Sequence, residues 1–172
     1  SLLLTGAFHE DGLADTFDGI GGGLNKARAL EIMKDSRLGT YGAAALFMAL
    51  ALKAGALFAL PPVWVCTALP LAHCLSRGSA VLVIATSRYV RDEGTGKPVA
   101  KGISAVTLVV TCLTLSGAVA ICLLVLPFVA VVSSFVAMCL MHVAMRAFFE
   151  PKLGGYTGDT LGAVQQASEI GI

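Results

Sequence analysis

Apolar residues occur in this chain as long uninterrupted runs, and these runs indicate the class of protein. Residues 103–126 are 24 consecutive positions without a charged side chain, and among residues 127–143 only His142 can carry a charge. A membrane-spanning helix needs about 20 such residues, which is longer than the apolar stretch of an ordinary buried helix. The pattern therefore predicts an all-α fold, that of a polytopic helical integral membrane protein in contact with a lipid bilayer.

Four segments have the length and apolar character of membrane spans. Prolines lie between the first and second of these segments and between the third and fourth. Pro61 and Pro62 end the first segment of one pair, and Pro127 separates the other pair, because proline cannot continue a helical hydrogen-bond ladder. We expect the spans at about residues 42–60, 63–85, 103–126 and 128–145.

The polar stretches between these spans carry most of the positive charge. Residues 5–41, 86–102 and 146–160 contain all the Lys and Arg residues except Lys53 and Arg77. The positive-inside rule places segments of this kind on the cytoplasmic side of the membrane. We therefore expect one multi-pass membrane domain over residues 1–172, with its polar motifs facing the cytoplasm.

Composition and the chain ends add two expectations. The chain is 56 % apolar and only 13 % charged, with a formal net charge of +1. Proteins that bind nucleic acid usually carry a strong basic excess, so nucleic acid is not expected as a partner. The chain opens on Ser1 and a further segment begins near Ile172, so we expect a fragment of a longer chain.

The stretch TGAFHEDGLADTFDGIGGG, residues 5–23, concentrates acidic side chains in a chain that has few of them. Asp11, Asp15 and Asp18 have i, i+4, i+7 spacing, which places three carboxylates on one stripe of a helix. Like charges on one stripe destabilise a helix unless a cation neutralises them, and oxygen ligands favour Mg²⁺. We predict a magnesium site at these aspartates; the alternative is a solvated acidic loop.

The segment that follows, NKARALEIMKDSRLGTYG, supplies candidate phosphate ligands. Leu30, Met33 and Arg37 would lie near one another if the whole segment were helical. Lys34 and Arg37 could hold phosphate oxygens, and Asp35 could act as a further metal ligand or as a base. Anchoring of basic side chains at the membrane surface explains Lys34 and Arg37 equally well.

Three ionisable side chains fall inside the second and first predicted spans: Lys53, His73 and Arg77. Such groups are costly at membrane depth and mark functional sites or paired interior groups. Arg77 lies about two turns from the cytoplasmic end of its span, so we expect it to reach the acidic site. Lys53 could snorkel to the surface or pair with an acid. Small residues at 42–45 and 117–118 permit close helix contacts and hence a homo-oligomer.

Near the end of the chain, GGYTGDTLGA at residues 154–163 sets Asp159 among small residues. Glycine permits close approach of two segments, and the predicted topology brings Asp159 to the same side of the bilayer as Asp11. Asp159 is therefore a candidate metal ligand or base. A helix cap formed by Asp159 or Thr157 is the structural alternative.

Taken together, these motifs resemble one known family. The first acidic motif, the segment RALEIMKDSRLGTYGAAAL, the pair at residues 76–77 and GGYTGDTLGA are similar to cobalamin synthase, the adenosylcobinamide-GDP ribazoletransferase family. The similarity runs in order from about Leu3 to Ile172. Family members are usually longer at both ends.

The resemblance implies a transferase of cobalamin (vitamin B12) biosynthesis. Such an enzyme joins adenosylcobinamide-GDP to α-ribazole, or to α-ribazole 5′-phosphate, and releases GMP. The resemblance also implies Mg²⁺ dependence and a location in the cell inner membrane. We expect the metal at Asp11, Asp15 and Asp18, and we expect catalytic contributions from Lys34, Asp35, Arg37, Arg77 and Asp159.

Three other interpretations stay open on the sequence, one of which is a non-catalytic scaffold within a membrane biosynthetic complex. DGLAD, residues 11–15, is similar to the D-G-x-x-A signature of the CDP-alcohol phosphotransferases of lipid synthesis, but Asp15 stands where those enzymes carry arginine. A membrane transporter could use Lys53, His73 and Arg77 as a substrate path. A transporter would distribute its charges through the spans, whereas most acids of this chain cluster in one motif.

Overall fold

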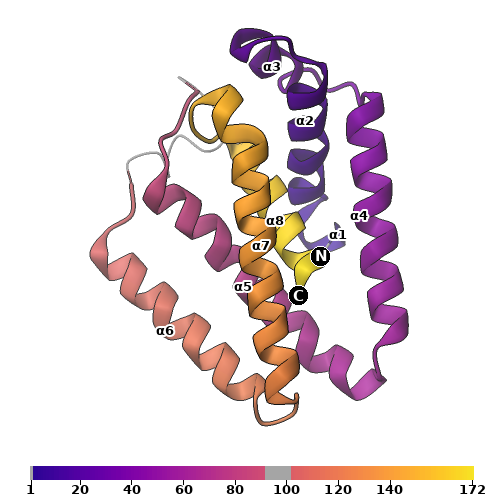
Figure 1. The fold of residues 1–172 in the computed structure, drawn as a ribbon, viewed down its shortest axis with the longest axis vertical. Helices are drawn as coiled ribbons and strands as arrows, with labels where there is room; N and C mark the ends of the chain where they lie inside the picture. Colours follow the sequence, from indigo (N-terminus) through magenta and orange to yellow (C-terminus); the bar gives the residue numbers. More distant parts are fainter. Residues whose placement is uncertain (1, 92–101) are drawn as a thin grey trace.

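The computed structural model describes residues 2–91 and 102–172, which form helices joined by short connections (Figure 1). The predicted all-α fold is confirmed, and within these ranges the one β-type pairing is a parallel bridge between Tyr89 and Tyr156. The helices are α1 (Leu2–Thr5), α2 (Phe8–Gly22), α3 (Lys26–Ile32), α4 (Thr40–Ala59), α5 (Pro62–Thr86), α6 (Ala105–Cys122), α7 (Phe128–Leu153) and α8 (Gly158–Gly171).

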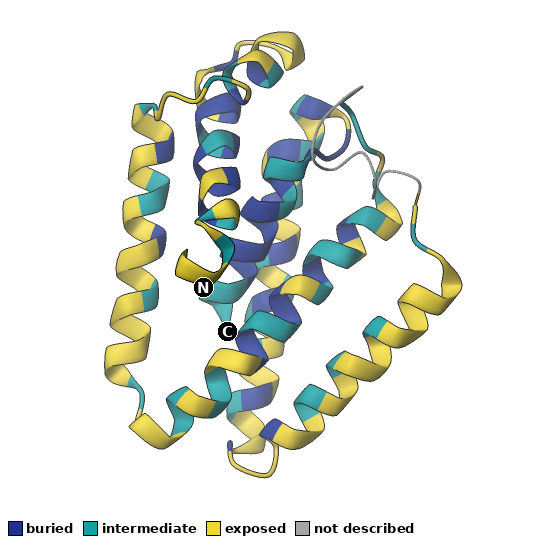
Figure 2. Cartoon of the chain, turned by 180° about the vertical axis from the view of Figure 1, so that it is seen from behind, coloured by how far each residue is buried: buried dark blue, intermediate teal, exposed yellow. Residues whose placement is uncertain are grey.

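Four of these helices, α4, α5, α6 and α7, are long and apolar enough to cross a membrane. Each overlaps one predicted span, although α6 ends at Cys122 and α7 continues to Leu153. Large apolar side chains cover their outer faces, with Phe58 95 % exposed and Val129 77 % exposed (Figure 2). An apolar surface of this extent suits lipid and would be a liability in water.

The centre of the bundle is formed by α2 and α8, which lie between the long helices (Figure 1). The two helices run antiparallel, because His9 lies against Gly162 and Gly12 lies against Asp159. The far end of α8 reaches well down the bundle, where the Ser134 hydroxyl of α7 donates to the carbonyl oxygen of Ile172.

The burial of α2 and α8 goes beyond what the sequence predicts. The sequence predicts residues 5–41 as a polar segment outside the spans and assigns residues 161–171 to no span, and the structure places α2 and α8 inside the helix bundle. Hydropathy alone missed them because they are moderately polar. Gln165 and Gln166 are at most 1 % exposed, and their amides find hydrogen-bond partners inside the protein.

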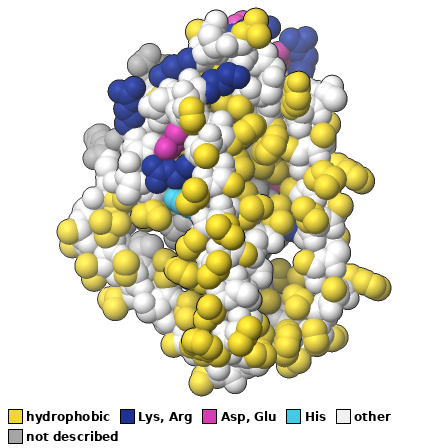
Figure 3. Space-filling view, in the orientation of Figure 1, with side chains coloured by type: hydrophobic (Ala, Val, Ile, Leu, Met, Phe, Trp, Pro, Cys, Tyr) yellow, Lys and Arg dark blue, Asp and Glu magenta, His cyan; other side chains and the backbone are white. Residues whose placement is uncertain are grey.

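Figure 3 shows Lys and Arg gathered mainly at the top of the face in view, with hydrophobic side chains covering most of its lower part. Two of these side chains tie the chain together there. Arg88 donates from Nε to the carbonyl oxygen of Gly154, and Lys152 donates to that of Ile20. Lys97 and Lys101, which belong to the predicted polar stretch 86–102, lie outside the described residues.

The helix α3 is shorter than the sequence predicts. It begins at an Asn25 cap, whose side chain accepts the backbone N–H of Arg28, and it ends at Ile32. Arg37 therefore does not share a helical face with Leu30, which was the expectation. The reason is local, because the Asp35 carboxylate accepts the backbone N–H of Arg37 at 3.1 Å and so favours a turn over a further helical turn.

Candidate functional site

Aspartates from the two central helices approach one another at the basic end of the bundle. Asp11 and Asp15 follow one stripe of α2, and Asp159 lies in the first turn of α8. The backbones of the two helices touch where Gly12 faces Asp159. The three carboxylates are therefore neighbours, although Asp159 is far along the chain from the two aspartates of α2. The predicted meeting of Asp159 with the first acidic motif is therefore present in the structure.

The position of Asp159 depends on how α8 begins. Thr157 caps the helix, because its side chain accepts the backbone N–H of Thr160 while the Thr160 hydroxyl accepts the backbone N–H of Thr157. The cap predicted at this point is thus made by Thr157, which leaves the Asp159 carboxylate available for the acidic cluster. Reciprocal caps of this kind fix the first turn of a helix and therefore the direction of its side chains.

Burial and neighbouring charges raise the pKa values of Asp15 and Asp159. Burial, together with the negative charges of Asp11 and Asp159, raises the pKa of Asp15 from 3.8 to about 7. Burial also raises the pKa of Asp159, and the nearby Arg91 guanidinium opposes that rise. Carboxylic acids have raised pKa values when negative charges gather without enough positive charge to balance them.

Arg91 is the cation of this cluster, and the sequence reasoning did not single it out. Its Nη2 atom lies 2.7 Å from Oδ2 of Asp159, and the two side chains are 11 % and 18 % exposed. The available signal was topological: residues 86–102 were expected on the same side of the membrane as the acidic motif. That argument places many basic residues together and does not distinguish Arg91 from its neighbours.

Asp18 lies on the same helix but faces a different neighbour. One of its carboxylate oxygens accepts the backbone N–H of Gly39 at 2.7 Å, and the other accepts that of Gly42 at 2.8 Å. These bonds hold the start of α4 against α2, and Asp18 is only 8 % exposed. Both oxygens of the Asp18 side chain thus serve to cap α4.

Three other predicted site residues also lie apart from the acidic cluster. Asp35 and Arg37 pair with each other, with a shortest distance of 2.6 Å, and the Arg37 side chain is 88 % exposed. The hydrogen bonds to Arg37 lower the pKa of Asp35. The neighbouring Lys34 is exposed. Among the described residues, no hydrogen bond or ion pair joins any of the three to Asp11, Asp15 or Asp159.

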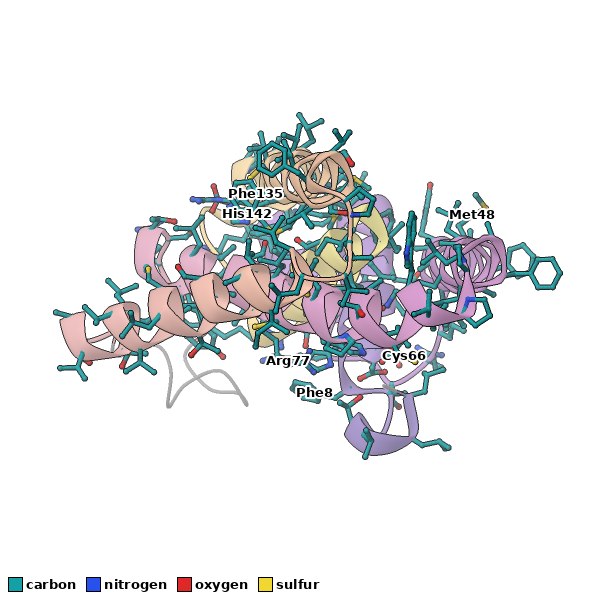
Figure 4. All side chains as sticks on the ribbon, turned by 90° about the horizontal axis from the view of Figure 1, so that it is seen from below. Phe8, Met48, Cys66, Arg77, Phe135 and His142 are labelled. Carbon is teal, nitrogen blue, oxygen red and sulfur yellow. The ribbon has the colours of Figure 1, made fainter. Side chains whose placement is uncertain are left out.

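Arg77 lies beside α1, the segment that precedes α2. Its Nη1 atom donates to the carbonyl oxygen of His73, and its side chain lines a cavity of about 260 Å³ with Leu4 and Thr5. Figure 4 shows Arg77 and Phe8 on the same side of the molecule. Burial and the positive charge of Arg77 lower the pKa of His9.

Lys53 and His73 meet a common acid inside the bundle. The Lys53 ammonium lies 3.0 Å from the Glu169 carboxylate of α8, and Nδ1 of His73 lies 3.2 Å from the same group. Lys53 also donates to Gln166, whose amide donates to Glu10. Of the two expectations for Lys53, pairing with an acid is the one found. Glu169 lies beyond the motifs considered in the sequence, and so it was missed.

The structure brings together only some of the carboxylates that the sequence predicts as magnesium ligands. Within residues 2–91 and 102–172, no three His, Cys, Asp or Glu side chains are grouped closely enough to hold a metal ion by themselves. Mg²⁺ is usually bound by one or two carboxylates, and water and substrate phosphates complete its octahedron. Asp11 and Asp15, with Asp159 beside them and an excess of negative charge, fit that kind of site, whereas Asp18 is engaged elsewhere.

Fold and site together define a class of protein: a multi-pass helical membrane protein with a carboxylate cluster and an arginine at one end of its bundle. Comparison with known sequences gives the family. The chain belongs to the cobalamin-5-phosphate synthase family, whose family model matches residues 1–172.

Curated relatives extend over nearly all of the chain. The adenosylcobinamide-GDP ribazoletransferases of Shewanella oneidensis and Shewanella putrefaciens are each 47 % identical to it over 176 residues. The enzyme of that name from Shewanella baltica is 46 % identical over 172 residues. Each alignment covers 98 % of this chain and 65 % of the relative, so the chain spans about 65 % of the length of these proteins. No solved structure matches the chain.

Proposed function

We propose that this chain carries the catalytic core of an adenosylcobinamide-GDP ribazoletransferase. The reaction would join adenosylcobinamide-GDP to α-ribazole, or to α-ribazole 5′-phosphate, and would release GMP. The observation that carries the proposal is the meeting of Asp11 and Asp15 with Asp159 beside Arg91, in a chain whose relatives bear that enzyme name.

The reaction is a substitution at phosphorus. A ribose hydroxyl oxygen of the acceptor forms a bond to the phosphorus that carries cobinamide, and the bond from that phosphorus to the oxygen of the departing GMP breaks. The hydroxyl proton must leave, and negative charge builds on the leaving phosphate. Both requirements suit a cluster of carboxylates with one arginine nearby.

A divalent cation fits the carboxylate pair of α2. Asp11 is exposed and Asp15 is half-buried, so both can approach a cation that is also bound by the substrate's phosphates. Mg²⁺ bound there would neutralise the charge of the diphosphate and of the departing GMP. Asp18 is not part of this proposal, because its oxygens accept the N–H groups at the start of α4.

We assign Asp159 as the general base that removes the proton of the acceptor hydroxyl. It lies beside Asp11 and Asp15, whereas Asp35 is held by Arg37 at the surface. The Thr157 cap and the contact with Gly12 fix the backbone of Asp159. A general base needs this kind of fixed position within reach of the hydroxyl that it deprotonates.

The proposed location is the cell inner membrane, with the carboxylate cluster on the cytoplasmic side. Support comes from the basic side chains that surround the cluster, since cytoplasmic segments carry an excess of Lys and Arg. Arg88, Arg91 and Lys152 all bond to protein groups at that end of the bundle.

Product analysis tests the proposed activity. The purified protein is incubated with GDP-linked adenosylcobinamide and α-ribazole or its 5′-phosphate, with Mg²⁺ or with EDTA. We expect GMP and the joined product only where Mg²⁺ is present. Release of CMP from a CDP-linked alcohol donor would instead support a lipid phosphotransferase. Uptake of substrate into proteoliposomes without a covalent product would support a transporter.

A further inference from the structure

We propose that Arg91 binds the diphosphate group of the nucleotide-linked donor, and that Asp159 holds its guanidinium in place until that group arrives. The identity of the diphosphate as part of a GDP-linked donor rests on the proposed function. The assignment of Arg91 rests on its own contacts, and it concerns a residue that neither the acidic motif nor the curated names single out.

The backbone around Arg91 is fixed by pairing with the segment that leads into α8. Val90 donates its N–H to the carbonyl oxygen of Tyr156 at 3.0 Å, and Tyr156 donates to that of Arg88 at 2.8 Å. Gly155 is part of this contact, because a Cβ at that position would meet the carbonyl oxygen of Arg88. The pairing delivers Arg91 to the first turn of α8, where Asp159 lies.

The guanidinium of Arg91 has an N–H donor without an acceptor among the described residues. Among the described residues, Nη2 contacts Asp159 and donates to the carbonyl oxygen of Met33 at 3.3 Å, while the buried Nε atom has no hydrogen-bond acceptor. A guanidinium presents five N–H donors in a planar fork that matches the oxygens of a phosphate. A buried N–H without an acceptor is unfavourable, so an arriving phosphate oxygen would be stabilised there.

Charge at the cluster favours the same exchange. Asp11, Asp15 and Asp159 lie near one another with Arg91 as the arginine that contacts them directly, through Asp159. A diphosphate that brings its own divalent cation would neutralise the carboxylates. Arg91 would then exchange a carboxylate partner for a phosphate partner without losing its ionic contact.

The other arginines of this region are less suited to the role. Arg37 is exposed and bound to Asp35. Arg88 uses Nε to hold Gly154, and Arg77 lines a cavity near the start of α2. Arg91 is the arginine that directly contacts a carboxylate of the central cluster.

Binding of inorganic pyrophosphate tests the assignment without any turnover. The protein in detergent is titrated calorimetrically in excess Mg²⁺, as wild type and as Arg91→Met, Asp159→Asn and the double variant. We expect Arg91→Met to weaken binding about tenfold or more, the effect of losing charge-assisted hydrogen bonds. We expect Asp159→Asn to tighten binding, because it releases the guanidinium. The matched control is Arg28→Met, which removes an exposed arginine paired with Glu31 and should leave binding unchanged.

The double variant separates release of Arg91 from a general loss of negative charge. If Asp159 acts by holding Arg91, the gain from Asp159→Asn disappears once Arg91 is methionine. A gain of the same size in both backgrounds overturns the proposal, as does unchanged binding by Arg91→Met. Should Arg91→Met not fold, Arg91→Lys keeps the charge without the fork, and undiminished binding by that variant overturns the proposal as well.

These outcomes are independent of the proposed function. Pyrophosphate contains neither the nucleoside nor the corrinoid, so the binding series reports on Arg91 alone. Absence of turnover with the GDP-linked donor, together with the expected pyrophosphate series, would overturn the proposed enzyme and leave the diphosphate site in place. Turnover with the GDP-linked donor, together with pyrophosphate binding that none of the variants changes, would support the proposed enzyme and overturn the diphosphate site at Arg91.

Discussion

Gly12 of α2 lies so close to Asp159 of α8 that no side chain fits between them. A Cβ atom built on Gly12 would be 2.8 Å from the carbonyl oxygen of Asp159 and 3.1 Å from its Cα atom. Contacts under 3.0 Å with a backbone atom cannot be relieved by a side-chain rotation, so α8 would have to move. This glycine therefore sets the separation of the two helices that carry the carboxylate cluster.

Gly12→Ala is expected to impair the proposed reaction far more than it impairs folding. Moving Asp159 by a fraction of an ångström disturbs its alignment with Asp11 and Asp15, and misplacements of about 1 Å can cost about a hundredfold in rate. The measurement is kcat/KM with the GDP-linked donor, alongside the thermal unfolding midpoint. Gly55→Ala is the matched control, because a Cβ on Gly55 meets nothing within 4 Å. Wild-type kcat/KM in Gly12→Ala would contradict this account.

Asp18→Ala is expected to destabilise the protein because it removes both acceptors at the start of α4. The loss of a buried cap that receives two backbone N–H groups should lower the free energy of unfolding by about 1–3 kcal/mol. Asp18→Asn retains one acceptor oxygen and should lose less. Glu31→Gln is the control for charge, since the Glu31 side chain is exposed on α3. The measurement is denaturant unfolding in detergent.

The same variants test the sequence-based metal assignment of Asp18. Unchanged stability of Asp18→Ala, combined with a strongly weakened response to Mg²⁺, would favour Asp18 as a metal ligand over Asp18 as a cap. We expect the opposite combination, with the Mg²⁺ response retained by the protein that remains folded.

The difference between Asp15 and Asp18 shows where the sequence reasoning stopped. Spacing correctly placed Asp11, Asp15 and Asp18 on one stripe of a helix. At a rise of about 1.5 Å per residue, however, Asp18 lies about 10 Å farther along the helix axis than Asp11. At the level of Asp11 and Asp15 the neighbour of α2 is the start of α8, whereas at the level of Asp18 it is the start of α4. Only the packing of the helices distinguishes the two.

The spans could be predicted because hydropathy is a property of each segment by itself. Partners for Arg91 and Lys53 could not, since each depends on which distant segment lies opposite. Arg91 contacts Asp159 because residues 88–90 pair with Tyr156. Lys53 contacts Glu169 because α8 extends into the bundle. No local pattern in the sequence encodes these contacts.

Asp15→Asn is expected to abolish product formation while the protein stays folded. The substitution keeps the size of the side chain but removes a carboxylate from the cluster, and it relieves the repulsion with Asp11 and Asp159. Product formation is measured over a range of Mg²⁺ concentrations, and helical content is checked by circular dichroism. Wild-type rates in this variant would remove Asp15 from the proposed metal site.

The raised pKa of Asp15 makes a prediction about stability and pH in EDTA. Because the pKa in the folded protein, about 7, exceeds the ordinary value of 3.8, the folded state binds the proton more tightly than the unfolded state. Protonation of Asp15 therefore stabilises the fold at low pH, and this contribution is lost as the pH rises from about 4 through 7. Asp11, Asp18, Asp159 and Arg91 are the charged groups that influence it.

Thermal unfolding of Asp15→Asn and wild type at several pH values measures this effect. Asparagine does not ionise, so the unfolding midpoint of the variant should exceed that of the wild type at pH 8 by more than it does at pH 5. A difference that stays constant across this range would mean that Asp15 ionises in the folded protein as readily as in the unfolded chain.

The ion pair of Lys53 and Glu169 yields a prediction about the interior of the bundle. Their side chains are 17 % and 7 % exposed, and Glu169 also receives a hydrogen bond of 2.7 Å from Gln165. Removing one partner of a buried pair leaves an uncompensated charge, whereas removing both avoids that penalty. Lys53→Met should therefore lower the free energy of unfolding by about 3 kcal/mol. The double variant Lys53→Met/Glu169→Gln should recover part of that loss.

A double-mutant cycle on denaturant unfolding in detergent measures the coupling of Lys53 to Glu169. Lys26→Met serves as the control for loss of a lysine, since Lys26 is exposed on α3 and should change the free energy of unfolding little. If the losses from Lys53→Met and Glu169→Gln simply add, the two side chains do not stabilise each other. In that case α8 would be held against α4 by packing alone, and the charges at this depth would need another explanation.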